Sequence, residues 1–304
     1  MFKFFSPAVA AICLSLPAAA EPLEKAPLLK AAFSEDVGAA DRIRAADRLR
    51  TLSQEISAAT CFLHNDVEPA LNHKLLADSI AEFDLLLDAL ANGNEDLHII
   101  GAETNRKTLA EIAAIKAEWQ PLHDAAQIIV DDHANTPAME MIYGQSEHLL
   151  ETTSHLLSEL EAEYSHPTQV LLTDVILIEF SGRQAMLTQK IAFEACLVWS
   201  GYGGDAQKQD LKVITERFDL IANALHDGLP AVGISAAPTD EIRVALEEVV
   251  VDWEEVLVHL DHMTAGGDVD KYEVEWISQS MTKKMKKMEE IVDMYTDYSR
   301  RAVL

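Results

Sequence analysis

Residues 178–196 read Ile-Glu-Phe-Ser-Gly-Arg-Gln-Ala-Met-Leu-Thr-Gln-Lys-Ile-Ala-Phe-Glu-Ala-Cys, and residues 43–57 read Ile-Arg-Ala-Ala-Asp-Arg-Leu-Arg-Thr-Leu-Ser-Gln-Glu-Ile-Ser. In both segments the apolar residues recur at helical spacing, which predicts an α-helix with one face in a core. The two segments align at an offset of 135 positions, which pairs Arg48 with Arg183, Gln54 with Gln189, and Cys61 with Cys196. They are therefore two copies of one helix.

The same alignment extends along most of the chain. Phe83-Asp84-Leu85 matches Phe218-Asp219-Leu220 at the same offset, and Trp119 matches Trp253 once one residue is dropped. Rare residues such as Trp and Cys do not align at one spacing by composition alone. A period this long indicates a tandem duplication of a whole domain, because solenoid repeats are roughly 20 to 50 residues long.

Punctuation by Pro, Gly and capping residues divides each copy into four helical segments. The expected segments are Ser34 to Asn65, Pro69 to Gly93, Thr104 or Thr108 to Asp132, Thr136 to His166, Thr168 to Trp199, Asp205 to His226, Thr239 to Met263, and Asp268 to Arg300. Few Gly and Pro and many Ala, Leu, Glu and Asp also favour helix. We therefore predict an all-α protein of two tandem antiparallel four-helix bundles, residues 35–166 and 168–304.

The two bundles are expected to lie in series, because only His166-Pro167 separates them. Equivalent positions would then lie tens of ångströms apart, given about 1.5 Å of rise per residue. That distance is far beyond the reach of a disulfide. Cys61 and Cys196 are accordingly predicted to be unpaired within one chain.

The N-terminus and the net charge predict an exported protein. Residues 1–20 contain Lys3, an apolar stretch and a small-residue cleavage site before Glu21, which is the pattern of a signal peptide; residues 21–34 form an N-terminal segment. No later apolar run is long enough to span a membrane. With 24 basic and 51 acidic side chains, the net charge of −27 excludes a general nucleic-acid binder. We expect the mature chain to be periplasmic.

The signature helix resembles that of the NarX/PilJ-like sensor domains. Their pattern, roughly I-N-L-A-G-R-Q-R-M-L-S-Q-R-I-A, is matched closely by residues 178–196 and less closely by residues 43–57. The family comprises periplasmic four-helix bundles of nitrate/nitrite sensor kinases and of transducers linked to type IV pili. The resemblance covers nearly all of residues 35–300, and it implies a sensor domain without specifying a ligand.

Carried over position by position, the resemblance supplies five candidate ligand-binding residues: Arg48, Arg50, Gln54, Arg183 and Gln189. In nitrate-sensing members an Arg at the position of Arg50 binds the anion between two subunits, but the second copy has Ala185 there. Asp47, three residues before Arg50, would compete with an anion for its guanidinium. From the residues alone, Arg48 and Arg183 fit either solvated flanks of the core or donors to a small oxyanion.

Other patterns in the sequence give weaker indications of metal binding or catalysis. Met281, Met285 and Met288 at helical spacing are expected to be core rather than copper ligands. His259 and His262 share a helix face. A surface metal site at these two residues is the less favoured interpretation. We predict no metal, no cofactor and no enzyme activity, because no catalytic triad, phosphate loop or haem motif is present.

Two functions stay open at this point. The first is a stand-alone sensor that binds a small anion or carboxylate and acts through a membrane receptor or sensor kinase, with a homodimer as a further option. The second is a structural or adaptor protein of the cell envelope that binds no ligand.

Overall fold

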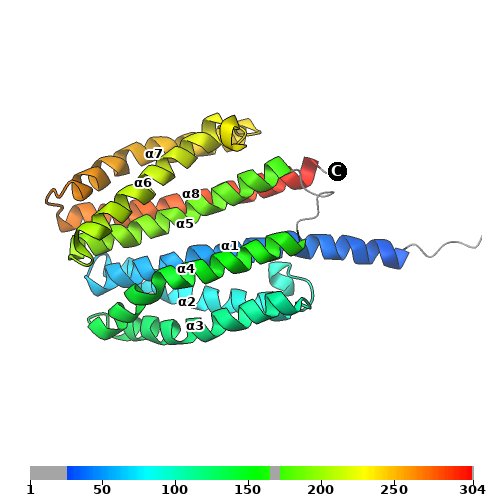
Figure 1. Cartoon of the computed structure of the whole chain (residues 1–304), viewed down its shortest axis with the longest axis horizontal. Helices are drawn as coiled ribbons and strands as arrows, with labels where there is room; N and C mark the ends of the chain where they lie inside the picture. Colours follow the sequence, from blue (N-terminus) through cyan, green and yellow to red (C-terminus); the bar gives the residue numbers. More distant parts are fainter. Residues whose placement is uncertain (1–25, 165–171, 303–304) are drawn as a thin grey trace, which may run out of the picture.

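The computed structural model describes residues 26–164 and 172–302 and is built from helices (Figure 1). All eight expected helical segments are present, no β-strand occurs within those two ranges, and the all-α prediction is confirmed. The first repeat contains α1 Ala26–His64, α2 Pro69–Asn92, the 3-10 helix η1 Glu95–Leu97, α3 Arg106–Asp131 and α4 Thr136–Tyr164. The second contains α5 Leu172–Ser200, α6 Gly204–Asp227, the 3-10 helix η2 Pro230–Val232, α7 Asp240–Thr264 and α8 Lys271–Ala302.

The helix boundaries follow local chemistry. Pro69 occupies the first turn of α2, where no intrahelical N–H donor is needed, and Gly93 ends that helix at a φ of 81°. The side chain of Thr239 caps α7 by accepting from the backbone N–H of Ile242 at 3.2 Å. Helix α1 begins at Ala26 rather than at the expected Ser34: Pro27 lies in its first turn, where proline is tolerated, and no Gly or Pro follows before Ser34.

Within each repeat, the four helices pack as an antiparallel bundle. Helix α1 packs against α2 and α4, and α3 packs against the same two; α5 to α8 repeat this arrangement. Trp119 lies against Phe83 and Trp253 against Phe218, with ring centroids 4.3 Å apart in both pairs. This repeated contact confirms that the sequence offset reflects a duplicated structure.

The two bundles lie side by side, so the expectation that they stand in series is wrong. Helices α1 and α5 run parallel and in contact through the middle of the molecule (Figure 1). Every residue of α1 from position 49 to 63 is buried, not only one face as the sequence pattern suggested. The reason is that the signature helix packs against its own bundle and also against its counterpart in the other repeat.

Cys61 and Cys196 form a disulfide, with an S–S distance of 2.06 Å and their Cα atoms 6.2 Å apart. The prediction of unpaired thiols is therefore wrong. In parallel helices related by an approximate two-fold axis, equivalent residues face each other instead of being separated by the bundle length. Asp47 and its equivalent Gly182 show the same relation, because a Cβ at Gly182 would lie 2.1 Å from Asp47 Oδ2.

Some expectations concern residues outside the described ranges. They are the signal peptide at residues 1–20, the first part of segment 21–34, and the junction at His166-Pro167. Among the helices of residues 26–164 and 172–302, none combines the length and apolar character that a membrane span requires.

Candidate functional site

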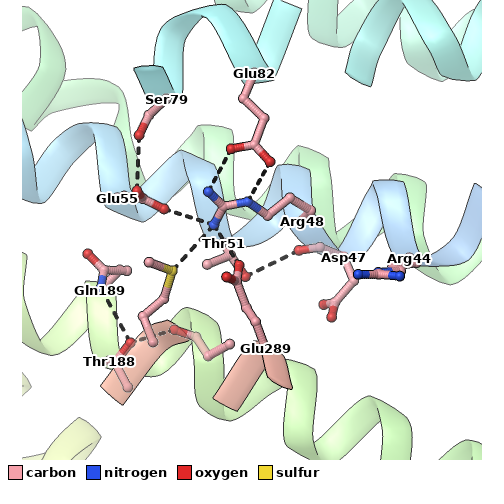
Figure 2. A network of polar contacts seen from close by, with 12 residues as sticks. Arg44, Asp47, Arg48, Thr51, Glu55, Ser79, Glu82, Thr188, Gln189 and Glu289 are labelled. Carbon is pink, nitrogen blue, oxygen red and sulfur yellow. Dashed lines mark hydrogen bonds and ion pairs between the residues drawn. The ribbon is translucent and has the colours of Figure 1, made fainter. Parts of the chain in front are cut away.

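The first candidate, Arg48, is enclosed by carboxylates from three helices (Figure 2). Its Nε and Nη2 donate to the two carboxylate oxygens of Glu82 on α2, at 2.9 and 2.7 Å. Its Nη1 donates to Glu55 on α1 at 2.8 Å and to Glu289 on α8 at 2.7 Å. These bonds use four of the five N–H groups of a guanidinium. Arg48 therefore joins the two repeats as an ion-pair hub.

Burial and charge shift the titration of this cluster. The Arg48 side chain is 19% exposed, and burial alone would lower its pKa, but hydrogen bonding to Glu82 and the charges of Glu55 and Glu289 raise the pKa overall. Burial raises the pKa of Glu289 to about 7; Arg48 opposes that rise, and Glu55 and Glu82 add to it. Glu289 therefore takes up a proton at a higher pH than an ordinary glutamate does.

A cleft of about 600 Å³ opens beside the hub, between α1, α2, η1 with the two residues that follow it, α5 and α8. Its walls carry more carboxylates than cations. The basic residues in the lining are Arg44, Arg48 and Lys286, together with His98. The acidic residues are Asp41, Asp47, Glu82, Asp96, Glu289, Glu290 and Asp293. Arg44 is itself paired with Asp293 at 2.8 Å. An anion entering this cleft would meet net negative charge.

The second candidate cluster lies on the opposite side of α1, where α1 meets α5. Arg50 is buried; its Nη2 donates to Asp47 at 2.5 Å and its Nη1 to Oε1 of Glu179 at 3.4 Å. Arg183 on α5 donates to the same Oε1 of Glu179 at 2.6 Å. The structure thus brings Arg50 and Arg183 together across one carboxylate and keeps Arg48 in a separate cluster.

Two features distinguish this Arg50–Arg183 seam from the Arg48 hub. The Nε of Arg50 is buried and has no hydrogen-bond partner in the described part of the chain. The Arg183 side chain is 41% exposed, and its guanidinium lies 5.7 Å from the centre of the Phe180 ring. Donors are therefore available at the seam that the hub does not offer.

Arg48 and Arg183 are equivalent in sequence but differ in their surroundings. The three glutamates that pair with Arg48 have no acidic equivalents at the corresponding positions around Arg183. Glu55, Glu82 and Glu289 correspond to Lys190, Arg217 and His155. The arginine is thus the same in both repeats, whereas its three acidic partners are replaced by two cations and a histidine, and Arg183 pairs with Glu179 instead.

A third carboxylate, Glu161 on α4, acts on the seam. Burial raises its pKa to about 7; the charges of Glu179 and Asp47 add to this rise, whereas Arg50 and Arg183 oppose it. Above neutral pH the seam therefore holds three carboxylates, and below it Glu161 loses its charge.

The two candidate glutamines lie in the bundle cores. The side-chain Nε2 of Gln54 donates to the backbone carbonyl of Ser146 on α4 at 3.3 Å. That of Gln189 donates to the backbone carbonyl of Met281 on α8 at 3.4 Å. In both repeats this residue ties the signature helix to the fourth helix of its own bundle, and these contacts are those of a packing residue.

The remaining sequence candidates take ordinary positions. Met281, Met285 and Met288 are buried in the core, as expected. His259 contacts Glu273 at 3.0 Å, and His262 lies 3.3 Å from the backbone carbonyl of Asp268. Across residues 26–164 and 172–302, His, Cys, Asp and Glu side chains form no group of three suited to a metal ion.

Sequence reasoning did not single out Glu179 and Glu161. Glu179 precedes Arg183 by one helical turn, so its i,i+4 pairing was a detectable signal. Its bond to Arg50 was not, because it depends on how α1 and α5 lie together. Glu161 lies 111 positions from Arg50, and only the bundle geometry places it nearby.

Comparison with known proteins adds one finding. The family model described as "Type IV pili methyl-accepting chemotaxis transducer N-term" matches residues 32–141 and 169–278. The two matches correspond to the two repeats and together cover well over half of the chain. No curated protein matches the sequence significantly.

Proposed function

The chain belongs to the family of type IV pili methyl-accepting chemotaxis transducer N-terminal domains, in two tandem copies, and from this premise we propose that it is an exported sensor that binds a small anion. Export rests on the signal-peptide pattern of residues 1–20. The sensor acts through a membrane receptor or sensor kinase, since transducer domains of this family serve membrane signalling. The anion is nitrate, nitrite or a small carboxylate.

The ligand site is the Arg50–Arg183 seam. The observation that carries this assignment is that two guanidiniums share one carboxylate oxygen, Glu179 Oε1, while the buried Nε of Arg50 has no partner in the described part of the chain. A planar anion of two or three oxygens can replace that carboxylate and accept from both arginines. At the Arg48 hub it would have to displace three carboxylates.

The seam also couples binding to the arrangement of the repeats. Arg50 and Asp47 belong to α1, whereas Glu179 and Arg183 belong to α5. Release of Glu179 by an anion would exchange a direct contact between α1 and α5 for one through the ligand. In nitrate-sensing relatives such a site lies between two subunits, and here one chain supplies both helices.

Thermal unfolding in a chloride-free buffer tests this function. At about 100 times its Kd, an anion that binds only the folded state stabilises it by about 2.7 kcal/mol. For a cooperative unit of roughly 270 residues this raises Tm by about 5 °C. The variants Arg50→Ala and Arg183→Ala should each lose the shift, and the shift should increase from pH 8 to pH 6 as Glu161 takes up its proton.

Two control variants make the outcome specific. Arg243→Ala removes an exposed positive charge on α7 and should keep the full shift. Arg48→Ala should lower Tm by breaking the hub, yet keep the increment caused by the anion. An increment that depends on Arg48 and survives loss of Arg50 and Arg183 would contradict the assignment of the site. No increment with nitrate, nitrite or acetate at millimolar concentration would favour the adaptor function.

A further inference from the structure

Helix α7 carries a stripe of exposed valines on its outer face. Val244, Val251 and Val258 are 46%, 58% and 68% exposed and lie seven residues apart. Positions seven apart drift by only about 20° around an α-helix, so the three side chains form one line along the axis. With a rise of 1.5 Å per residue the line is about 21 Å long. Figure 1 shows α7 on the side of the molecule away from the first repeat.

The bundle does not require these valines. In the first repeat the equivalent helix is α3, and its equivalent positions are Ala110, Ala117 and Asp124, all exposed. Both helices bury the same aromatic pair with their inner faces. β-Branched residues also lower helix propensity slightly compared with Ala. The stripe is therefore a property of the second repeat alone and has no role in its core.

Glutamates border the stripe on both sides. Glu247 and Glu254 flank it on one side and Glu248 and Glu255 on the other, and all four are exposed. Arg243 lies 3.7 Å from Glu247, and Lys287 on α8 lies 2.7 Å from Glu248. In the described ranges Glu254 and Glu255 form no salt bridge. On the α8 side the charges of Lys283 and Lys284 also act on Glu255. The surface is thus an apolar line whose border is rich in glutamate, with Glu254 and Glu255 as the carboxylates that form no salt bridge within the described ranges.

We propose that this face of α7, defined by Val244, Val251, Val258 and the four bordering glutamates, docks an amphipathic helix of a partner protein. The partner helix presents aliphatic residues at heptad spacing, bordered by Lys or Arg. A second copy of this chain does not fit, because its own glutamates would face these glutamates. The inference is independent of the anion site, which lies at the seam between α1 and α5.

A designed peptide of three heptads, with Leu along one line and Lys on both flanks, is the probe for this surface. Its affinity for the full-length protein is measured by calorimetry. Replacing all three valines by Ala, the residue that α3 has at two of these positions, should weaken binding at least tenfold with an unchanged helical circular dichroism spectrum. Glu254→Lys with Glu255→Lys should weaken binding similarly and reduce its salt dependence.

Matched controls separate this surface from general stickiness. Val213→Ala with Leu220→Ala removes two exposed apolar residues from the neighbouring helix α6 and should leave the affinity unchanged. Equal binding by the triple Ala variant, or by a peptide with Glu on its flanks, would overturn the proposal. Valine-dependent self-association in sedimentation, or valine-dependent binding to anionic lipid vesicles, would assign the stripe to a different occupant and also overturn it.

Discussion

Reduction of the Cys61–Cys196 disulfide should destabilise the protein without changing its sequence. The bond closes a loop of 135 residues. In the chain-entropy model, a loop of this length costs the unfolded state about 17 cal/mol/K, or about 5 kcal/mol at 25 °C. Both cysteines are fully buried, so the bond can be reduced only after unfolding or a large opening. For a unit of roughly 270 residues, the loss corresponds to a fall in Tm of about 9 °C.

The assay compares two forms of the wild-type chain. One is oxidised; the other is reduced in urea and refolded in the presence of a phosphine reductant. Equilibrium unfolding in urea is followed by circular dichroism at 222 nm, and peptide mapping without reduction identifies the cross-linked peptides. The expected result is a lower midpoint for the reduced form with native helicity below the transition.

A double variant provides the control. Cys61→Ala with Cys196→Ala should resemble the reduced wild type and should not respond to the reductant. Identical midpoints for oxidised and reduced wild type, or two free thiols in the native oxidised protein, would refute the side-by-side arrangement of α1 and α5 from which the prediction follows.

Two further predictions concern the contact between the repeats and a buried carboxylate. Gly182→Ala should cost about 1 to 3 kcal/mol of unfolding free energy, because its Cβ would lie 2.1 Å from Asp47 Oδ2; Asp47→Ala should relieve most of this cost in chemical denaturation, and additive effects would count against the contact. Burial raises the pKa of Glu194 to about 7, helped by Asp210 and Glu147 and opposed by Lys190. The folded state binds this proton more tightly than the unfolded state does. The stabilisation by the bound proton is therefore fully present below about pH 4.5, the ordinary pKa of a glutamate, and is lost as the pH rises to about 7. Glu194→Gln should therefore have a larger free energy of unfolding than wild type at pH 8, by up to about 3 kcal/mol, measured in urea. If the difference in unfolding free energy between the variant and wild type were the same at pH 5 and pH 8, the raised pKa of Glu194 would be contradicted.

The fold of each repeat was accessible from the sequence because its causes are local. Pro69, Gly93 and Thr239 mark helix ends by backbone chemistry that does not depend on the rest of the molecule. Rare residues that recur at one offset, such as Trp119 and Trp253, identify the duplication without knowledge of any contact between helices. Burial of the methionine stripe on α8 followed from its spacing and was confirmed.

The candidate site was only partly accessible. The signature helix singled out Arg48, Arg50 and Arg183 as candidates, but most of their partners come from other helices. Arg48 meets Glu289, which lies 241 positions away, and Arg50 meets Glu179, which lies 129 positions away. Whether a guanidinium is available to a ligand depends on such partners, and side-chain spacing within one helix does not specify them.

The sequence by itself determined eight helices, their duplication and the four-helix bundle of each repeat, since these follow from helical periodicity and from turns a few residues long. Only the tertiary structure decided that α1 and α5 pack in parallel, that Cys61 bonds Cys196, and that Arg50 and Arg183 share Glu179. The physical reason is that a short junction limits the distance between two bundles but not their direction. That direction depends on the apolar and small-residue surfaces that α1 and α5 bury against each other, and these surfaces resemble ordinary core faces until the partner helix is in place.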